Sequence, residues 1–342
     1  MRTSGFCLLR RIGAVAVLLA LAACGGGGSD GIPPAPPSAP PPADARNGDY
    51  TVVAANAREY LLALDFDART WRMSGNGLDQ SGAIVSDAGG FVFQPAGLPA
   101  VFNTARFVQA NDTVTGGFRF PEGVLPFVAP RLFVSSVAEG AGVYNFLTRT
   151  VDTAAPASNA IFQGELTTGG KLRTCADFLI QAIAECPEAS VSTGTVTVAG
   201  NVFTSTTPTG AFPFRIARVG TDKVFLRASV SVGTSRRFWV GVPATTAFAA
   251  GSFSGANTDG NWSSSALNSS AHLPSITTPA GTSLSRSGGA LAVGNGPLAG
   301  LLALSTQDSG SYFAARSADL AVIVSGRDST AAAGFVEIGR RQ

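Results

Sequence analysis

The stretch Lys223-Val224-Phe225-Leu226-Arg227-Ala228-Ser229-Val230 mixes apolar and polar residues over the length of a strand and directly follows the turn residues Gly220-Thr221-Asp222. Runs of this kind, bounded by Gly, Asn, Asp and Pro clusters, are typical of antiparallel β-strands joined by tight turns. The pattern continues from Tyr50 onward, with breaks at Gly75-Asn76-Gly77 and Ala88-Gly89-Gly90. The 342 residues include 41 glycines without a collagen-like period, which also favours many tight turns. We therefore predict an all-β fold of antiparallel sandwich or small-barrel modules.

The order of the predicted strands also repeats along the chain. Three copies open at Gly48-Asp49-Tyr50-Thr51, Gly142-Val143-Tyr144-Asn145-Phe146 and Gly251-Ser252-Phe253-Ser254, and each closes on an aromatic strand such as Arg237-Phe238-Trp239-Val240. Residue identities between the copies are weak, so a divergent triplication and an accidental β periodicity both stay open. The predicted modules are residues 47–138, 139–243 and 244–342. Residues 243–298 have an unusual composition, with Ser, Thr, Ala, Gly and Asn dominating 250–271, and we expect a long loop here. A third copy that is looser than the other two is the alternative.

The N-terminus has the features of an export signal. Arg2, Arg10 and Arg11 precede an uncharged apolar run, residues 12–23, which is shorter than the roughly 20 residues of a membrane-spanning helix. The run ends Leu21-Ala22-Ala23-Cys24, and this resembles the lipobox of bacterial lipoproteins. The resemblance implies a signal peptide over residues 1–23, a diacylglyceryl group on Cys24 and further acylation of the new amino terminus. An ordinary signal peptide with a chance cysteine is the alternative.

Residues 24–46 form the expected tether. Gly25 to Ser29 is flexible, and the Pro/Ala/Ser tract up to Pro42 favours an extended polyproline conformation that holds a folded body away from a membrane. The lipobox and this tether resemble uncharacterised lipoproteins of proteobacteria, in which a residue other than Asp after the lipid cysteine implies the outer membrane. The chain is less closely similar to surface lipoproteins of the transferrin-binding type, which join a flexible anchor to antiparallel barrels. Whether the body faces the periplasm or the outside stays open.

Two cysteines remain beyond the predicted anchor, and we expect Cys175 and Cys186 to pair in an oxidising compartment. One straight helix between them would separate their Cα atoms by about 16 Å, whereas a disulfide needs about 4.4–6.8 Å. We therefore expect a short helix of about two turns that begins at the capping pattern Thr174-Cys175-Ala176-Asp177, followed by a reversal before Pro187. A redox-active pair is the alternative, but the Cys-x-x-Cys spacing is missing.

Signals for catalysis are few. His272 is the single histidine and is expected in a polar loop, where it and Trp262 are possible ligand contacts. Alternation places Asp65 and Asp67 on one face of a strand, where they could bind calcium or act as a glycosidase-like pair. The alternative is two solvated acids on either side of a buried Phe66. We predict no metal and no cofactor other than the covalent lipid on Cys24.

The charge balance excludes a general affinity for nucleic acid. Removal of residues 1–23 takes away three arginines and no acid, which changes the formal net charge from +2 to −1. These features together predict an outer-membrane lipoprotein with a non-enzymatic binding or structural role, whose partner is an envelope protein or glycan met by loops, above all within 243–298. The alternative is a hydrolase that acts on an envelope glycan or ester through Asp65 and Asp67.

Overall fold

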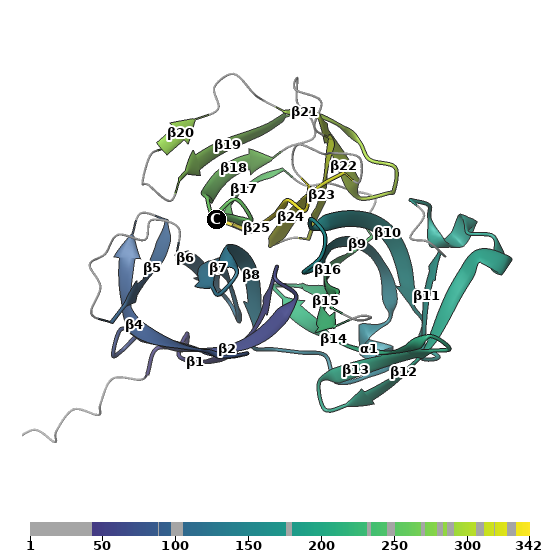
Figure 1. Cartoon of the computed structure of the whole chain (residues 1–342), viewed down its shortest axis with the longest axis horizontal. Helices are drawn as coiled ribbons and strands as arrows, with labels where there is room; N and C mark the ends of the chain where they lie inside the picture. Colours follow the sequence, from purple (N-terminus) through teal and green to yellow (C-terminus); the bar gives the residue numbers. More distant parts are fainter. Residues whose placement is uncertain are drawn as a thin grey trace, which may run out of the picture. The chain divides into compact units, whose positions relative to one another are not determined.

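The first module closes into an eight-stranded antiparallel barrel in which each strand pairs with its neighbour in the chain (Figure 1). Its strands are β1 (Gly48–Ala54), β2 (Arg58–Asp65), β3 (Thr70–Gly75), β4 (Leu78–Asp87), β5 (Gly90–Pro95), β6 (Arg106–Ala110), β7 (Thr113–Phe120) and β8 (Gly123–Pro130). The pair Val53 and Val128 joins β1 to β8 and closes the circuit. Because side chains alternate along a strand, Tyr50 and Val52 fill the barrel while Val53 points out of it into a second cluster.

This computed structural model describes residues 43–342 except 88, 97–104, 176–179, 231–233, 245–249, 268–270, 279–282, 286–290, 306–310, 318 and 327–332. Cys24, the predicted signal peptide and most of the predicted tether therefore lie outside the described residues. The described part of the chain contains no helix that is long and apolar enough to cross a membrane.

A second eight-stranded barrel follows the first (Figure 1). It is built from β9 (Gly142–Val151), β10 (Ser158–Leu166), β11 (Lys171–Cys175), β12 (Val191–Ala199), β13 (Val202–Thr207), β14 (Gly210–Val219), β15 (Asp222–Val230) and β16 (Arg236–Pro243). Strand β16 pairs with β9 from Arg236 to Pro243, which closes the barrel. The short helix α1 (Val137–Gly140) precedes it, and the hydroxyl of Ser136 caps this helix by accepting from Glu139 N at 3.2 Å.

The third module is a nine-stranded antiparallel sheet. Its strands are β17 (Gly251–Asn257), β18 (Trp262–Leu267), β19 (Ala271–Thr277), β20 (Ser283–Ser285), β21 (Leu291–Asn295), β22 (Leu301–Ser305), β23 (Ser311–Arg316), β24 (Leu320–Ser325) and β25 (Val336–Arg341). Strand β17 pairs with both β18 and β25, and β19 pairs with both β18 and β21. The pairings therefore run round a closed circuit of eight strands, with β20 attached to β19. The prediction of an all-β protein built from antiparallel sandwich or small-barrel modules is confirmed, and the first two modules are closed barrels.

The prediction of a long loop over residues 243–298 is wrong, because β17 to β21 all lie within this segment. At Gly255 a small residue is needed for close strand pairing and does not mark a loop. A Cβ atom added at Gly255 would lie 1.8 Å from Ile338 O on β25, so only glycine permits this approach. Phe253 and Leu267 supply the buried side chains that anchor the two strands in the core.

The outer faces of the three modules share one hydrophobic cluster. Val53 of the first barrel, Leu226 of the second and Val322 of the third all belong to it. Polar contacts add to this packing: Arg149 Nη1 donates to Ala55 O at 2.7 Å, and Arg340 Nη1 donates to Thr113 O at 3.3 Å. Residues 43–342 consequently form one compact unit.

Cys175 and Cys186 form a disulfide, with their Cα atoms 5.9 Å apart, as the sequence predicted. The predicted start of a helix at Cys175 is wrong, since this residue ends β11 and pairs with Val191 of β12. Sheet pairing has here overridden a local capping pattern. Within the described part of the segment there is one 3-10 turn, Ile183–Glu185, and residues 176–179 lie outside the described residues.

Candidate ligand-binding site in the second barrel

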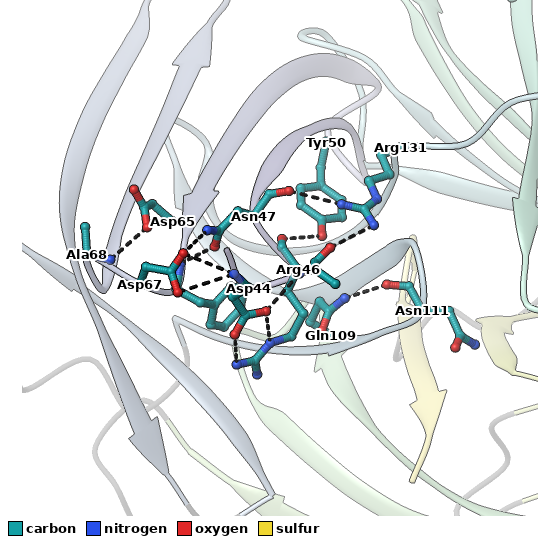
Figure 2. Close-up of polar contacts among 12 residues, drawn as sticks. Asp44, Arg46, Asn47, Tyr50, Asp65, Asp67, Ala68, Gln109, Asn111 and Arg131 are labelled. Atoms are coloured by element: carbon teal, nitrogen blue, oxygen red, sulfur yellow. Dashed lines mark hydrogen bonds and ion pairs between the residues drawn. The ribbon is translucent and has the colours of Figure 1, made fainter. Parts of the chain in front are cut away.

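The predicted carboxylate pair has local structural roles in the first module. Asp65 Oδ1 accepts from Ala68 N at 2.7 Å and closes the turn after β2. Asp67 Oδ2 accepts from Asn47 Nδ2 at 2.7 Å and from Asp44 N at 3.1 Å, which ties the segment before β1 to this turn, as Figure 2 shows. The two carboxylates therefore serve different hydrogen bonds, and among the described residues no group of three or more His, Cys, Asp or Glu could hold a metal ion.

The other two predicted contact residues lie on strands. Trp262 is the first residue of β18 and its side chain is only 7% exposed, so it does not offer the open stacking surface that a loop tryptophan would give. His272 lies on β19, where it pairs with Leu267 and Leu291, and its side chain is outside what the structure describes. The expected polar loop around His272 is thus a strand.

A cavity with a volume of about 270 Å³ lies inside the second barrel. It is at the end where β11 and β13 finish and where β12 and β14 begin, because Thr174, Ser192, Thr207 and Gly210 all line it. Thr174 directly precedes Cys175, so the disulfide crosslinks the chain next to the lining of the cavity.

The opposite end of this barrel is filled. Phe214 stacks on Phe225 with ring centroids 4.2 Å apart, and Phe225 meets the edge of Phe146 at 4.9 Å. Tyr144 donates its hydroxyl to Gly140 O of α1 at 2.6 Å, and burial raises the pKa of this phenol. Aromatic packing of the described residues thus closes one end, and the cavity lies toward the disulfide end.

Strand β15 brings a charge into this cavity by simple alternation. Phe225 and Arg227 point into the barrel, whereas Leu226 and the partly buried Ala228 pack outward against the shared cluster. On the neighbouring strand β16, Arg237 and Trp239 point inward in the same way. Two arginines and an aromatic ring therefore line the same space.

The Arg227 guanidinium is buried, with 3% of the residue exposed. Its Cζ atom lies 3.8 Å from the ring centroid of Phe212 and 4.5 Å from that of Trp239, and its Nε donates to Ser229 Oγ at 2.7 Å. Burial, and then the charge of Arg237, lower the pKa of Arg227 to about 9. The side chain still carries its positive charge at neutral pH, and no acidic residue is among the described residues that line the cavity.

The hydroxyl of Ser205 is the second unusual group. This residue is 1% exposed, it lines the cavity, and its Oγ has no hydrogen-bond partner. Gly194 makes room for it, since a Cβ atom at Gly194 would lie 2.2 Å from Ser205 Oγ. A buried hydroxyl without a partner costs free energy, and such a group usually marks a position that a ligand or water satisfies.

The alternation of side chains along two strands already indicates this site in the sequence. Period-two alternation places Arg227 on the same face as Phe225, and Arg237 on the same face as Trp239. A charged residue two positions from a core aromatic is a buried charge if the strand is real. Ser205 gave no such signal, because serine is ordinary on either face of a strand.

Comparison with known proteins identifies no family. No family model matches the chain, and no curated protein matches it. A solved structure of a protein of unknown function from the DUF3598 family of Nostoc punctiforme matches with 11% sequence identity over 86% of this chain and 94% of that chain, at a TM-score of 0.19. At this TM-score the similarity supports no conclusion about fold or function.

Proposed function

We propose that the chain is an outer-membrane lipoprotein, anchored by lipid on Cys24, whose second barrel binds a small ligand without catalysing a reaction. The anchoring rests on the lipobox, residues 21–24, and on the Gly/Pro-rich segment behind it. The binding role rests on the cavity, which combines apolar walls with a few buried polar groups, the usual composition of a small-molecule site. The observation that carries the proposal is the buried Ser205 hydroxyl without a partner, which faces this space.

Anchoring is tested with Cys24→Ala in the producing bacterium. The unchanged chain is expected to incorporate a palmitate analogue and to fractionate with outer membranes, whereas the variant should lose the label and appear in soluble fractions. A variant that keeps both the label and the membrane association would refute the anchor at Cys24.

Ligand binding is tested by ligand-observed NMR on the full exported chain in a nonionic detergent, with a set of small charged and neutral fragments. The variant Gly194→Leu places a large side chain in the cavity and is expected to abolish binding of the fragments that the unchanged chain holds. Thr193→Leu is the matched control, because Thr193 is exposed on the other face of the same strand. If no fragment binds, or if both variants lose binding equally, the second barrel is not a small-ligand site.

A further inference from the structure

We propose that the cavity of the second barrel takes a small organic anion, a carboxylate joined to a compact apolar body. This inference rests on the proposed binding function and names the chemical class of its ligand. It follows from the charge of the cavity, from the unpartnered hydroxyl on its wall and from the apolar surface beside them.

The charge of the cavity selects an anion. Arg227 and Arg237 both line it, and the pKa of Arg227 is lowered by burial and by the second arginine, with no acid acting in the opposite direction. The rings of Phe212 and Trp239 stabilise the cation through their faces but provide no negative charge. A ligand with a negative charge would therefore compensate the charge of Arg227, which no acid of the described lining offsets, whereas a cation would be repelled.

The polar groups fit a carboxylate. Ser205 Oγ can donate one hydrogen bond, and it is buried in the wall without a protein acceptor. Thr174 and Ser192 add further hydroxyl-bearing side chains to the lining. Arginine and hydroxyl donors that converge from several strands are the usual way to hold a carboxylate inside a protein, because charge-assisted hydrogen bonds are the strong ones.

The remaining surface and the volume limit the rest of the ligand. Leu172, Phe212 and Trp239 give the cavity an apolar side that inorganic phosphate or sulfate would leave unused. A volume of about 270 Å³ is near the lower limit for small-molecule pockets. The part of the ligand that lies inside the cavity is therefore compact, such as a short-chain or single-ring carboxylate.

The test measures affinities for matched pairs of ligands by calorimetry on the full exported chain in a nonionic detergent. Compact carboxylates, with benzoate as the first, are each compared with the neutral amide of the same shape, and inorganic phosphate is included as an anion without an apolar body. We expect at least one carboxylate to bind its site at least about tenfold more tightly than its amide does, because a charge-assisted hydrogen bond contributes at least that factor. Phosphate should bind more weakly than this carboxylate.

Variants connect the binding to the arginines. Arg227→Gln and Arg237→Gln should each weaken carboxylate binding about tenfold or more while changing amide binding little. The matched control is Arg72→Gln, since Arg72 is exposed on the first barrel and should change neither affinity. Near-ultraviolet circular dichroism, which reports on the packing of Trp239, establishes that each variant is folded.

The outcomes separate the two proposals. If neutral fragments bind in the cavity and no carboxylate exceeds its amide, the anion class is wrong while the ligand-binding function stands. If phosphate binds as tightly as the best carboxylate, the apolar body is wrong. If nothing in either ligand set binds, both the anion class and the binding function fail.

Discussion

Arg227→Met should make the protein more stable when no ligand is added, because the buried charge of Arg227 opposes folding. The pKa of Arg227 falls from the ordinary arginine value of about 12.5 to about 9. At about 1.4 kcal/mol for each tenfold change, burial of this charge costs about 5 kcal/mol at neutral pH. Methionine has a similar length and removes the charge, but it also removes contacts of about 1–2 kcal/mol with the two rings and the hydrogen bond to Ser229, about 1 kcal/mol. We therefore expect a net gain of about 2 kcal/mol, within the range seen when buried charges are replaced by apolar side chains.

The measurement is urea unfolding at pH 7 of the full chain and the variant, together with a thermal scan. A gain of about 2 kcal/mol corresponds to roughly 4 °C in Tm for a chain of this size. Arg72→Met, at an exposed position, serves as the control and should change the free energy of unfolding by less than about 0.5 kcal/mol. A loss of more than about 1 kcal/mol in Arg227→Met would show that the arginine holds the barrel together and would remove the reason to assign it to a ligand.

Three other changes test the packing of the third module and of the cavity. Burial raises the pKa of Glu337 to about 7. Because the folded protein then keeps a proton that the unfolded chain releases above about pH 4.5, the free energy of unfolding should fall by about 3 kcal/mol as the pH rises from 4.5 to 7. Glu337→Gln should remove this fall in urea titrations at pH 4 and pH 8, and an unchanged profile would contradict the prediction. Arg340→Ala removes a fully buried guanidinium that contacts the first barrel and should cost about 3 kcal/mol in the same assay, whereas the exposed Arg341→Ala should cost little. Gly255→Ala should destabilise by about 3 kcal/mol, because its Cβ would strike backbone atoms. Gly194→Ala should destabilise by less than about 1 kcal/mol, because its Cβ would strike the rotatable hydroxyl of Ser205 and contact the Thr207 methyl group at 3.2 Å. Equal losses in thermal scans would refute this distinction.

The strand pattern could be predicted from the sequence because strands and turns are specified locally. The stretch Lys223–Val230 has the composition of a strand and is preceded by turn residues, and all of it lies in β15. The pairing of Cys175 with Cys186 also followed from the sequence, because these two cysteines remain beyond the predicted anchor of an exported chain. The closure of each module into a circuit did not follow, since the pairing of β8 with β1 joins residues that are distant in the chain.

The errors have a common physical cause. The prediction of a loop over residues 243–298 rests on the small polar residues that dominate 250–271, and the prediction of a helix from Cys175 rests on a capping pattern. In both cases sheet pairing decided the conformation: Gly255 is required by the close approach of β25, and Cys175 is held by β12. Local composition predicts a loop or a cap only where no neighbouring strand competes for the same backbone groups.

Two buried arginines show why burial alone does not identify a functional residue. Arg340 is 1% exposed and Arg227 is 3% exposed, and burial lowers the pKa of both. Arg340 has an acid, Asp319, at 3.6 Å and a carbonyl acceptor on the first barrel, so its charge is compensated by the fold and contributes to the contact between modules. Arg227 has two aromatic rings and one hydroxyl, beside a second arginine and an open cavity. The difference lies in what surrounds each charge, and it makes opposite predictions: removal of Arg340 should destabilise the protein, whereas removal of Arg227 should stabilise the protein and weaken its binding of an anion about tenfold or more.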